Sequence, residues 1–343
     1  MDTNGECTTC HAQVSEAKGG SGTIYRTLKE ALDAGEQSVT LLRYAELGVE
    51  SLPSVELDLG GYDLHINGIL FADKDRNLTV KGTGALSAGG ISIQPGGTLT
   101  ISGDVDASFA GTVSNSGTFY MNGGQINALS CNSDSTTVLS AGKITTVEVR
   151  GGKTVADLLA PGKAFYRDGN VVKGNQSRLV DGPYEIKDHT HSWSGNSCKT
   201  CGLECKHTSR KYDDDNKLIC DDICHQHLVL FVDGKTYFPR VLDDSGKEVT
   251  LSRFLEECKS PVHIQLLEDG LNAAGIVTKP GITLESYDTM QELPGEAIEI
   301  GNGGELTVEG DLSTQASGAD SCTFRVAGGG TLDRKSTRLN SSH

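Results

Sequence analysis

Residues 91–104 read ISIQPGGTLTISGD, and residues 298–311 read IEIGNGGELTVEGD. Each segment contains two short runs in which apolar and polar residues alternate, and a turn with a glycine pair separates the runs. Alternation with a period of two is typical of strands that bury one face. Because the two segments correspond position by position, they predict that one structural cassette occurs twice in the chain.

Two further pairs of segments recur in the same order. Residues 7–13 (CTTCHAQ) correspond to residues 220–226 (CDDICHQ), and residues 27–32 (TLKEAL) correspond to residues 250–255 (TLSRFL). Three matching pairs in one order indicate a repeated unit rather than chance similarity. The chain is therefore predicted to hold one complete cassette and the start of the next.

Each cassette is predicted to open with a short amphipathic helix. In the first copy Thr27 can cap the helix while Glu30 reaches back to the backbone, and Gly35 suits the position just after the helix. We interpret Cys258, one turn beyond the second helix, as a small core residue rather than a ligand. The apolar faces comprise Leu28, Ala31 and Leu32 in the first copy and Leu251, Phe254 and Leu255 in the second.

After each helix come many short alternating strands separated by Gly, Asn, Asp and Ser, such as residues 55–59, 64–66, 78–80, 99–101 and 118–121. Strands of this kind favour an all-β right-handed parallel β-helix of roughly 20 residues per turn, in which each rung packs on its neighbours. The opening helix would cover the exposed edge of the first rung. The alternative is a β-sandwich, for which Asn67-Gly68 and Asn122-Gly123 would be hairpin turns.

Composition excludes several classes of protein. The 343 residues carry 46 acidic and 30 basic side chains, a formal net charge of −16. A protein that binds nucleic acid needs positive charge facing the phosphates, so we expect no nucleic-acid partner. No apolar run approaches the roughly 18 residues of a transmembrane helix. No secretion signal precedes the first cassette. Because the sequence is expected to be a fragment, this missing signal says nothing about location.

The sequence divides into five predicted segments. The last of them, DRKSTRLNSSH, is basic and aperiodic, resembles the in-frame translation of a sequencing adapter, and is excluded from the fold. The segments are residues 1–22, the end of a truncated Cys module and a linker; 23–180, a β-helix domain; 186–227, a Cys/His module; 228–332, a partial second β-helix domain; and 333–343, the artefactual tail.

Residues 151–172 are predicted to close the first β-helix, with Leu158, Leu159, Phe165 and Tyr166 sealing its end. The run Asp-Leu-Leu-Ala-x-Gly-x-Ala-Phe-Tyr within it, followed by a Cys/His module, resembles repetitive cell-surface proteins of Gram-positive anaerobic bacteria that carry pectin-lyase-like β-helices. The resemblance covers nearly the whole chain except the tail. It implies an extracellular or cell-surface location and an adhesive or scaffolding role toward glycans, host matrix or cell wall. Members of this group mostly lack an assigned activity.

The Cys/His module contains two sets of four candidate metal ligands. Thiolate sulfur and imidazole nitrogen are the ligands of tetrahedral structural zinc, and four protein ligands leave no position for a reactive water. Gly202 directly follows a Cys-x-x-Cys turn and supplies the permissive backbone that such a turn needs. A module this small buries little apolar surface, so a bound metal would supply folding free energy. The first set is His189, His191, Cys198 and Cys201, and the second is Cys205, His207, Cys220 and Cys224.

Disulfides are the main alternative for these cysteines, because a secreted protein can use them as covalent links. However, the first set has His189 where the second has Cys205, and imidazole can replace a metal ligand but not a disulfide partner. Residues 7–11 (CTTCH) also match the attachment pattern of c-type haem. Trp193 and Tyr212 are predicted to pack against the metal sites, with a sugar contact as the alternative for Trp193.

We expect no enzymatic activity, with a β-helix polysaccharide lyase or hydrolase as the alternative. Glycoside hydrolysis requires two carboxylates that face one bond, and Asp104 with Asp106 is the best candidate pair. No Arg or Lys lies near this pair in the sequence to meet a uronate or a developing anion. The sequence also lacks the Gly-x-Ser-x-Gly and P-loop motifs of other enzyme classes.

Overall fold

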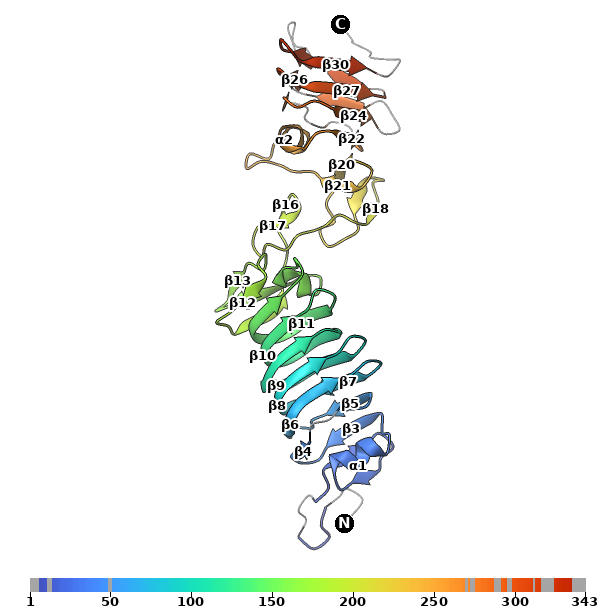
Figure 1. Ribbon diagram of the computed structural model, residues 1–343, viewed down its shortest axis with the longest axis vertical. Helices are drawn as coiled ribbons and strands as arrows, with labels where there is room; N and C mark the ends of the chain where they lie inside the picture. The colour runs from blue at the N-terminus through green and yellow to red at the C-terminus, as the bar shows by residue number, and fades with distance from the viewer. Residues whose placement is uncertain are drawn as a thin grey trace. The chain divides into compact units, whose positions relative to one another are not determined.

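The computed structural model describes residues 6–10, 14–48, 51–268, 271, 275–286, 291–294, 298–310, 312–315 and 324–334. Contacts divide the chain into two units, Met1–His191 with Thr200–Leu203, and Ser192–Lys199 with Glu204–His343. Strands account for 52% of the residues and helices for 6%, and the strands form a parallel β-solenoid of about 13 turns. The predicted all-β parallel β-helix is therefore confirmed, and each unit is described separately below (Figure 1).

Parallel pairing in the first unit distinguishes a solenoid from a sandwich. Strands β5 (Val55–Asp58), β7 (Asn77–Lys81), β9 (Thr98–Asn115), β10 (Thr118–Cys131) and β11 (Thr136–Val149) lie side by side in one sheet. Every neighbouring pair among them is parallel, and Leu99 lies in register between Leu78 and Phe119. A sandwich of hairpins would instead pair successive strands in antiparallel fashion.

Several strands are much longer than the sequence suggested, because they continue around the corners of the coil. Glycines make the corners: Gly124, within β10, has a φ of +71°, and a Cβ there would lie 2.5 Å from the carbonyl oxygen of Val105. The two Asn-Gly pairs, 67–68 and 122–123, lie inside strands at shifts of register rather than in hairpin turns. β3 (Ser38–Leu41) continues the first side of the coil beyond β5. The second side is carried by β4 (Ala45–Leu47), β6 (Leu64–Ala72) and β8 (Thr83–Ile93), which pair in parallel in that order.

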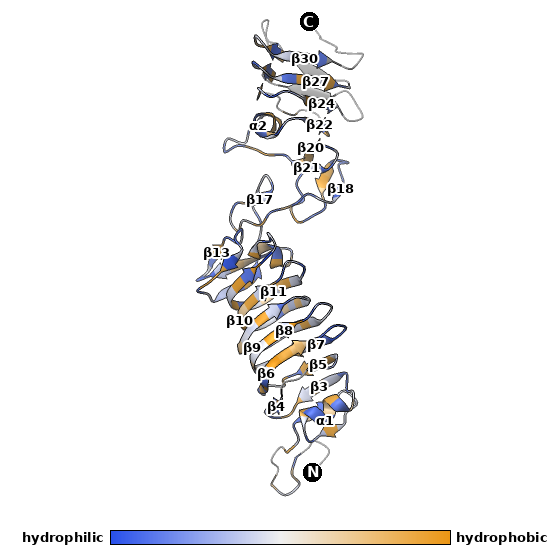
Figure 2. Cartoon of the chain, in the orientation of Figure 1, coloured by the Kyte–Doolittle hydropathy of each residue, from blue (hydrophilic) through white to orange (hydrophobic). Residues whose placement is uncertain are grey.

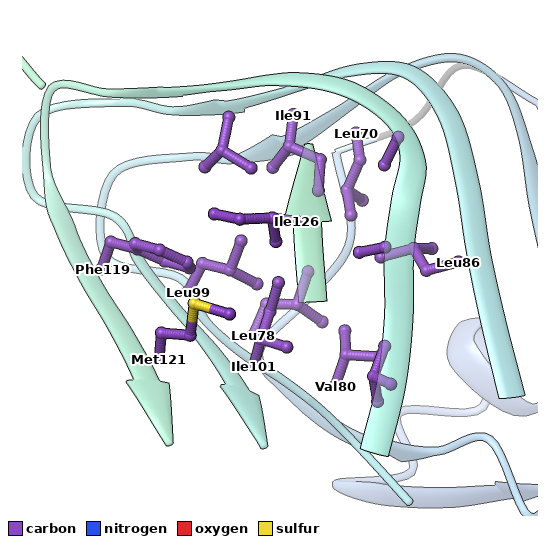
Figure 3. Close-up of a cluster of buried hydrophobic side chains, with 14 of the residues drawn as sticks. Leu70, Leu78, Val80, Leu86, Ile91, Leu99, Ile101, Phe119, Met121 and Ile126 are labelled. Atoms are coloured by element: carbon purple, nitrogen blue, oxygen red, sulfur yellow. The ribbon is translucent and has the colours of Figure 1, made fainter. Parts of the chain in front are cut away.

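The core of the first unit is a column of apolar side chains inside the coil. Leu78, Leu99 and Phe119 follow one another from rung to rung and point into this interior (Figure 3). All three are at most 1% exposed, whereas Tyr120, the next residue on β10, is 37% exposed. This alternation is the burial pattern expected when one face of each strand packs on the core.

Both solenoids begin with the same cap. In the first, β1 (Ala17–Gly19) pairs antiparallel with β2 (Ile24–Tyr25) and β3, with α1 (Leu28–Asp33) between them. In the second, β20 (Leu228–Val232) pairs antiparallel with β21 (Thr236–Pro239) and β22 (Val262–Leu266), with α2 (Thr250–Glu257) between them. The predicted repeat is thus a repeat of structure as well as sequence.

The predicted helix signals are also confirmed. Thr27 and Glu30 form the capping box of α1, and Gly35 has a φ of +77° just after the helix. The helix carries hydrophilic and hydrophobic residues together (Figure 2), and its three predicted apolar residues are buried. Cys258 is 7% exposed within the apolar core of the second unit, as expected for a core residue.

The first solenoid ends in a small antiparallel cover. It comprises η1 (Val155–Leu158), β12 (Lys163–Arg167), β13 (Asn170–Val172), β14 (Arg178–Leu179) and β15 (Tyr184–Asp188), and β15 pairs antiparallel with β11. Leu158 and Phe165 are buried against the same core as the rungs, and Leu159 packs on it. Tyr166 is half-buried outside this core, and its hydroxyl contacts His189 instead, so the prediction that it seals the end is wrong. The segment therefore closes the coil as the sequence indicated.

The second unit begins another solenoid. Strands β22, β24 (Ile282–Ser286), β27 (Glu305–Glu309) and β30 (Thr331–Arg334) form parallel ladders. Strand β30 includes Asp333 and Arg334 of the predicted tail, and residues 335–343 lie outside the described residues. Within the described residues, no helix is long and apolar enough to cross a membrane. Two further parallel sheets form the other sides of these turns. One consists of β23 (Gly275–Val277), β26 (Ile298–Ile300) and β29 (Phe324–Val326), and the other of β25 (Gln291–Pro294) and β28 (Leu312–Gln315).

Candidate metal centres

The second predicted set of ligands converges within the second unit. Cys205 and His207 precede a hairpin of β18 (Arg210–Tyr212) and β19 (Leu218–Cys220), which returns the chain so that Cys220 and Cys224 lie beside them. The four ligand atoms lie within 4.8 Å of one another, and all four residues are buried. This group is therefore able to hold a metal ion.

The pairwise distances in this cluster are short. The sulfurs of Cys205 and Cys220 are 3.6 Å apart, and Nδ1 of His207 lies 3.4 Å from the sulfur of Cys224. A disulfide requires a sulfur–sulfur distance of about 2.05 Å, so Cys205 and Cys220 are in contact without being bonded. Nε2 of His207 is buried and has no hydrogen-bond partner among the described residues.

The thiols of this cluster influence one another strongly. Hydrogen bonding from Cys224, and also from His207, lowers the pKa of the Cys205 thiol to about 4, although burial acts against the shift. Burial raises the pKa of the Cys220 thiol to about 11, and the neighbouring charge of Cys205 adds to the effect. The pKa of Cys224 is also raised, chiefly because its thiol hydrogen bonds to Cys205. A second thiolate beside the first is thus unfavourable unless a cation shares the site.

Asp222, which the sequence reasoning missed, ties the two halves of this cluster together. Its carboxylate accepts hydrogen bonds from the Thr208 backbone N–H at 2.6 Å and from the hydroxyl of Ser209. Burial raises the pKa of Asp222, but the hydrogen bonds from Ser209 and Thr208 outweigh burial and hold it below its ordinary value. An ionised Asp222 therefore keeps the segment after His207 beside the turn between Cys220 and Cys224.

The same backbone conformation follows the last cysteine of both sets. Gly202 has a φ of +73° after Cys201, as predicted, and His225 has a φ of +49° after Cys224. His225 is held there by a contact of 3.2 Å between its Nδ1 and the carbonyl oxygen of Cys220. The left-handed conformation is unfavourable for a histidine, so its occurrence at the matching position indicates that the turn requires it.

Three of the four residues of the first set lie together in the first unit. The ligand atoms of His189, His191 and Cys201 are within 4.8 Å of one another, with Nδ1 of His191 3.4 Å from the sulfur of Cys201. The imidazole of His189 also contacts two hydroxyls, those of Tyr166 at 3.2 Å and Thr200 at 2.9 Å. Cys198, the remaining residue of this set, is buried on the Ser192–Lys199 stretch that belongs to the second unit.

The two predicted aromatic contacts have different outcomes. Trp193 is partly buried and packs against a cluster that includes Cys205, Cys220 and Tyr237. The prediction that Trp193 packs against the site is therefore confirmed. Tyr212 is 66% exposed, so the prediction that it packs against a metal site is wrong. Its strand, β18, has three exposed residues in a row, which leaves no apolar face for packing.

Other metal-ligating side chains are distributed along both units. Cys10 is exposed, whereas His11 of the haem-like pattern lies outside the described residues. A third group that the sequence reasoning missed has its ligand atoms within 4.8 Å of one another, and it consists of His263, Glu285 and Glu309 on three successive rungs of the second unit. Successive members are about twenty residues apart in the sequence, so no short motif connects them. They become neighbours because the strands that carry them pair in parallel.

Asp104 and Asp106 line an open groove of about 640 Å³ on the first unit. Lys143 and Lys187 line the same groove, so basic side chains do lie near the acidic pair in space, although none lies near it in the sequence. Burial raises the pKa of Asp106, but hydrogen bonds from Ser108 and Gln125 outweigh it and hold the pKa below its ordinary value. Asp106 is therefore a carboxylate rather than a proton donor at neutral pH.

Comparison with known proteins yields no relative from which a function follows. No protein-family model, no curated protein and no solved structure matches the chain.

Proposed function

We propose that the chain is a modular surface protein in which metal-stabilised Cys/His modules join β-solenoid cassettes. The observation that carries this proposal is the convergence of three buried cysteines and one buried histidine on a single point of the second unit. Such a donor set suits a structural metal site with four protein ligands. The module has little apolar core of its own, and a bound metal would supply the missing folding free energy.

Zinc is the metal that we propose for these sites, and the distances between the ligand atoms support it. Tetrahedral zinc, with bonds of about 2.3 Å to sulfur and about 2.0–2.1 Å to nitrogen, separates two sulfurs by about 3.8 Å and a sulfur from a nitrogen by about 3.5 Å. The corresponding distances here are 3.6 Å between Cys205 and Cys220 and 3.4 Å between His207 and Cys224. Cys201 and His191 of the first set are also 3.4 Å apart. We propose that Cys198 completes this first set, as the Cys-x-x-Cys spacing predicts.

The experiment for the metal is elemental analysis of the purified chain, with thiol titration before and after chelation. We expect two equivalents of zinc per chain, and thiols of the two ligand sets that become reactive only after chelation, whereas the exposed Cys10 reacts before it. Cys220→Ala should lose one equivalent. The matched control is Cys131→Ala, which removes a buried cysteine of the first unit and should leave the zinc content unchanged. Absence of metal together with oxidised cysteines would establish the disulfide alternative and overturn the proposal.

The role that we propose for the solenoids is that of spacers and binding faces at the cell surface, presented to glycans, host matrix or cell wall. The support is the repeated cassette with its own cap, together with the resemblance drawn from residues 151–172. A repeated rigid unit can be extended by adding copies, because each rung contacts only its neighbours. Binding of the chain to a glycan array, with a heat-unfolded sample as control, tests this role. A chain that binds no glycan and no matrix protein would contradict it.

A polysaccharide-active enzyme is the second candidate, and the groove that contains Asp104 and Asp106 is the observation in its favour. Lys143 and Lys187 supply the basic groups that a uronate substrate would need. Hydrolysis would further require one protonated carboxyl group, a role that the ionised Asp106 does not suit. The test is release of reducing sugar by the chain, and loss of this activity in Asp104→Ala would support this candidate. The control is Asp134→Ala, which changes an exposed turn residue and should retain the activity.

A further inference from the structure

Four polar residues form a continuous chain of contacts on the outer face of the first unit. Glu46 on β4, His65 on β6 and Ser87 on β8 occupy matching positions on three successive rungs, with Glu46 in register with His65 and His65 in register with Ser87. Asn67 lies two residues after His65, on the same face of β6. Adjacent rungs are about 4.8 Å apart, so these side chains meet directly.

The contacts run from a hydroxyl through an imidazole and an amide to a carboxylate. The Ser87 hydroxyl is 2.7 Å from Nδ1 of His65. Nε2 of His65 is 2.9 Å from Oδ1 of Asn67, and Nδ2 of Asn67 donates to Oε1 of Glu46. The hydroxyl of Tyr44 also hydrogen bonds to Glu46.

The carboxylate at one end fixes the direction of every hydrogen bond in this chain. The amide nitrogen of Asn67 can only donate, and it donates to Glu46, which leaves the amide oxygen facing His65. That oxygen only accepts, so the ring proton of His65 lies on Nε2. Nδ1 then carries a lone pair, and the Ser87 hydroxyl must donate to it. The hydroxyl proton of Ser87 is thus already directed at a base.

We propose that Ser87 is the nucleophile of an acyl-transfer site in which His65 is the general base and Asn67 and Glu46 are positioning residues. A hydroxyl, a base within hydrogen-bond reach and a third group that orients the base are the recurring parts of such sites. The substrate class is an ester of a short-chain carboxylic acid with a polar alcohol. This activity goes beyond the scaffold role, which needs no chemistry from the solenoid.

The surroundings of Ser87 fit an ester whose alcohol part is polar. Ala85, two residues earlier on β8, is in register with Asp106, which lines the groove described above. A polar alcohol such as a saccharide can therefore lie in the groove while its acyl group reaches Ser87. The pairing of β6 with β8 also shifts register between Ile66 and Ile69, and such irregularities often re-aim side chains beside active sites.

The reaction balances without an added oxidant or cofactor. Oγ of Ser87 attacks the acyl carbon while its proton passes to Nδ1 of His65, and the bond from that carbon to the alcohol oxygen breaks. The alcohol leaves with the proton from Nδ1, so that an acyl-Ser87 ester and neutral His65 remain. Water then attacks the acyl carbon with His65 again as base, which releases the carboxylic acid and restores the Ser87 hydroxyl.

The experiment treats the full chain with p-nitrophenyl acetate and locates the transferred acetyl group by peptide mass spectrometry. We expect acetyl on Ser87, and a rate of labelling that falls about 100-fold or more in His65→Gln, as for loss of a general base. Ser87→Ala should lose the label at this position. The matched control is Ser92→Ala on the same strand, whose hydroxyl accepts a hydrogen bond from Gln94 instead of contacting a histidine. It should be labelled on Ser87 like the unmodified chain.

The positioning roles are tested through the pH dependence of labelling. Glu46→Gln removes the group that sets the direction of the hydrogen bonds, so the pH–rate profile should move while the thermal unfolding temperature stays the same. Glu46→Asp, which keeps the charge, should restore much of the rate. An unlabelled Ser87 in the folded chain, or labelling that is independent of His65, would overturn the proposal. Neither outcome affects zinc content, because none of these residues belongs to a metal cluster.

Discussion

Truncation of Phe119 should destabilise the first unit far more than truncation of its neighbour Tyr120. Phe119 is fully buried in the interior of the coil, and loss of a buried phenylalanine ring costs about 3–5 kcal/mol, because apolar contacts are lost and a cavity remains. Tyr120 points outward and is 37% exposed, so its truncation removes only cross-strand contacts worth about 0.2–1 kcal/mol.

The two variants can be compared by calorimetry of the full chain. For a domain of this size, 1 kcal/mol corresponds to roughly 2–4 °C, so Phe119→Ala should lower the unfolding temperature of the first unit by roughly 6–20 °C. The fluorescence of Trp193, the single tryptophan and a residue of the second unit, should report an unchanged transition. Equal effects of Phe119→Ala and Tyr120→Ala would refute the assignment of inward and outward faces on β10.

Three further predictions concern the second unit and the corners of the first. Chelation should shift the emission of Trp193 to longer wavelength, because this residue packs against the cysteines of the second ligand set. An unchanged spectrum would contradict this contact. Asp222→Ala should lower zinc affinity about 10–100-fold in competition with a chromophoric chelator, since it supports the ligands without binding metal, and unchanged affinity would contradict that role. Gly124→Ala should lower the unfolding temperature more than Gly152→Ala: both have positive φ, but only at Gly124 would a Cβ meet a backbone oxygen, 2.5 Å away. Equal losses would mean that the backbone yields at this corner.

The fold was predictable because a solenoid is built from local rules. Alternation in residues 91–104 determines which side chains face the core, and the capping box at Thr27 determines where the helix begins. Both signals act within a few residues, so they are legible in a single sequence. Strand length was less predictable, because a glycine such as Gly124 ends a strand in most folds and here only turns its direction.

The candidate sites also differ in whether local sequence or the register between rungs brings their residues together. Cys205 and His207 were recognisable because metal ligands come in close pairs along the chain. The Ser87–His65 contact and the approach of Lys143 to Asp106 depend on register between rungs, which no short motif records. A search for reactive pairs separated by about one rung would have found the first of these contacts once the period was known.

The repeated cap gives a physical reason for the arrangement of modules. A β-solenoid exposes unpaired backbone groups at each end, and such an edge invites association with other chains. In both units the first rung is covered by two antiparallel strands and a helix, and the last rung of the first solenoid is covered by β12 to β15. Each solenoid therefore has its own edge protection and its own core. The Cys/His module has only a small apolar cluster, which it shares with Leu228 and Tyr237 of the second cap. We therefore expect metal binding to govern the order of this module, and a change in metal supply to act there and at this cap while the two solenoid cores stay folded.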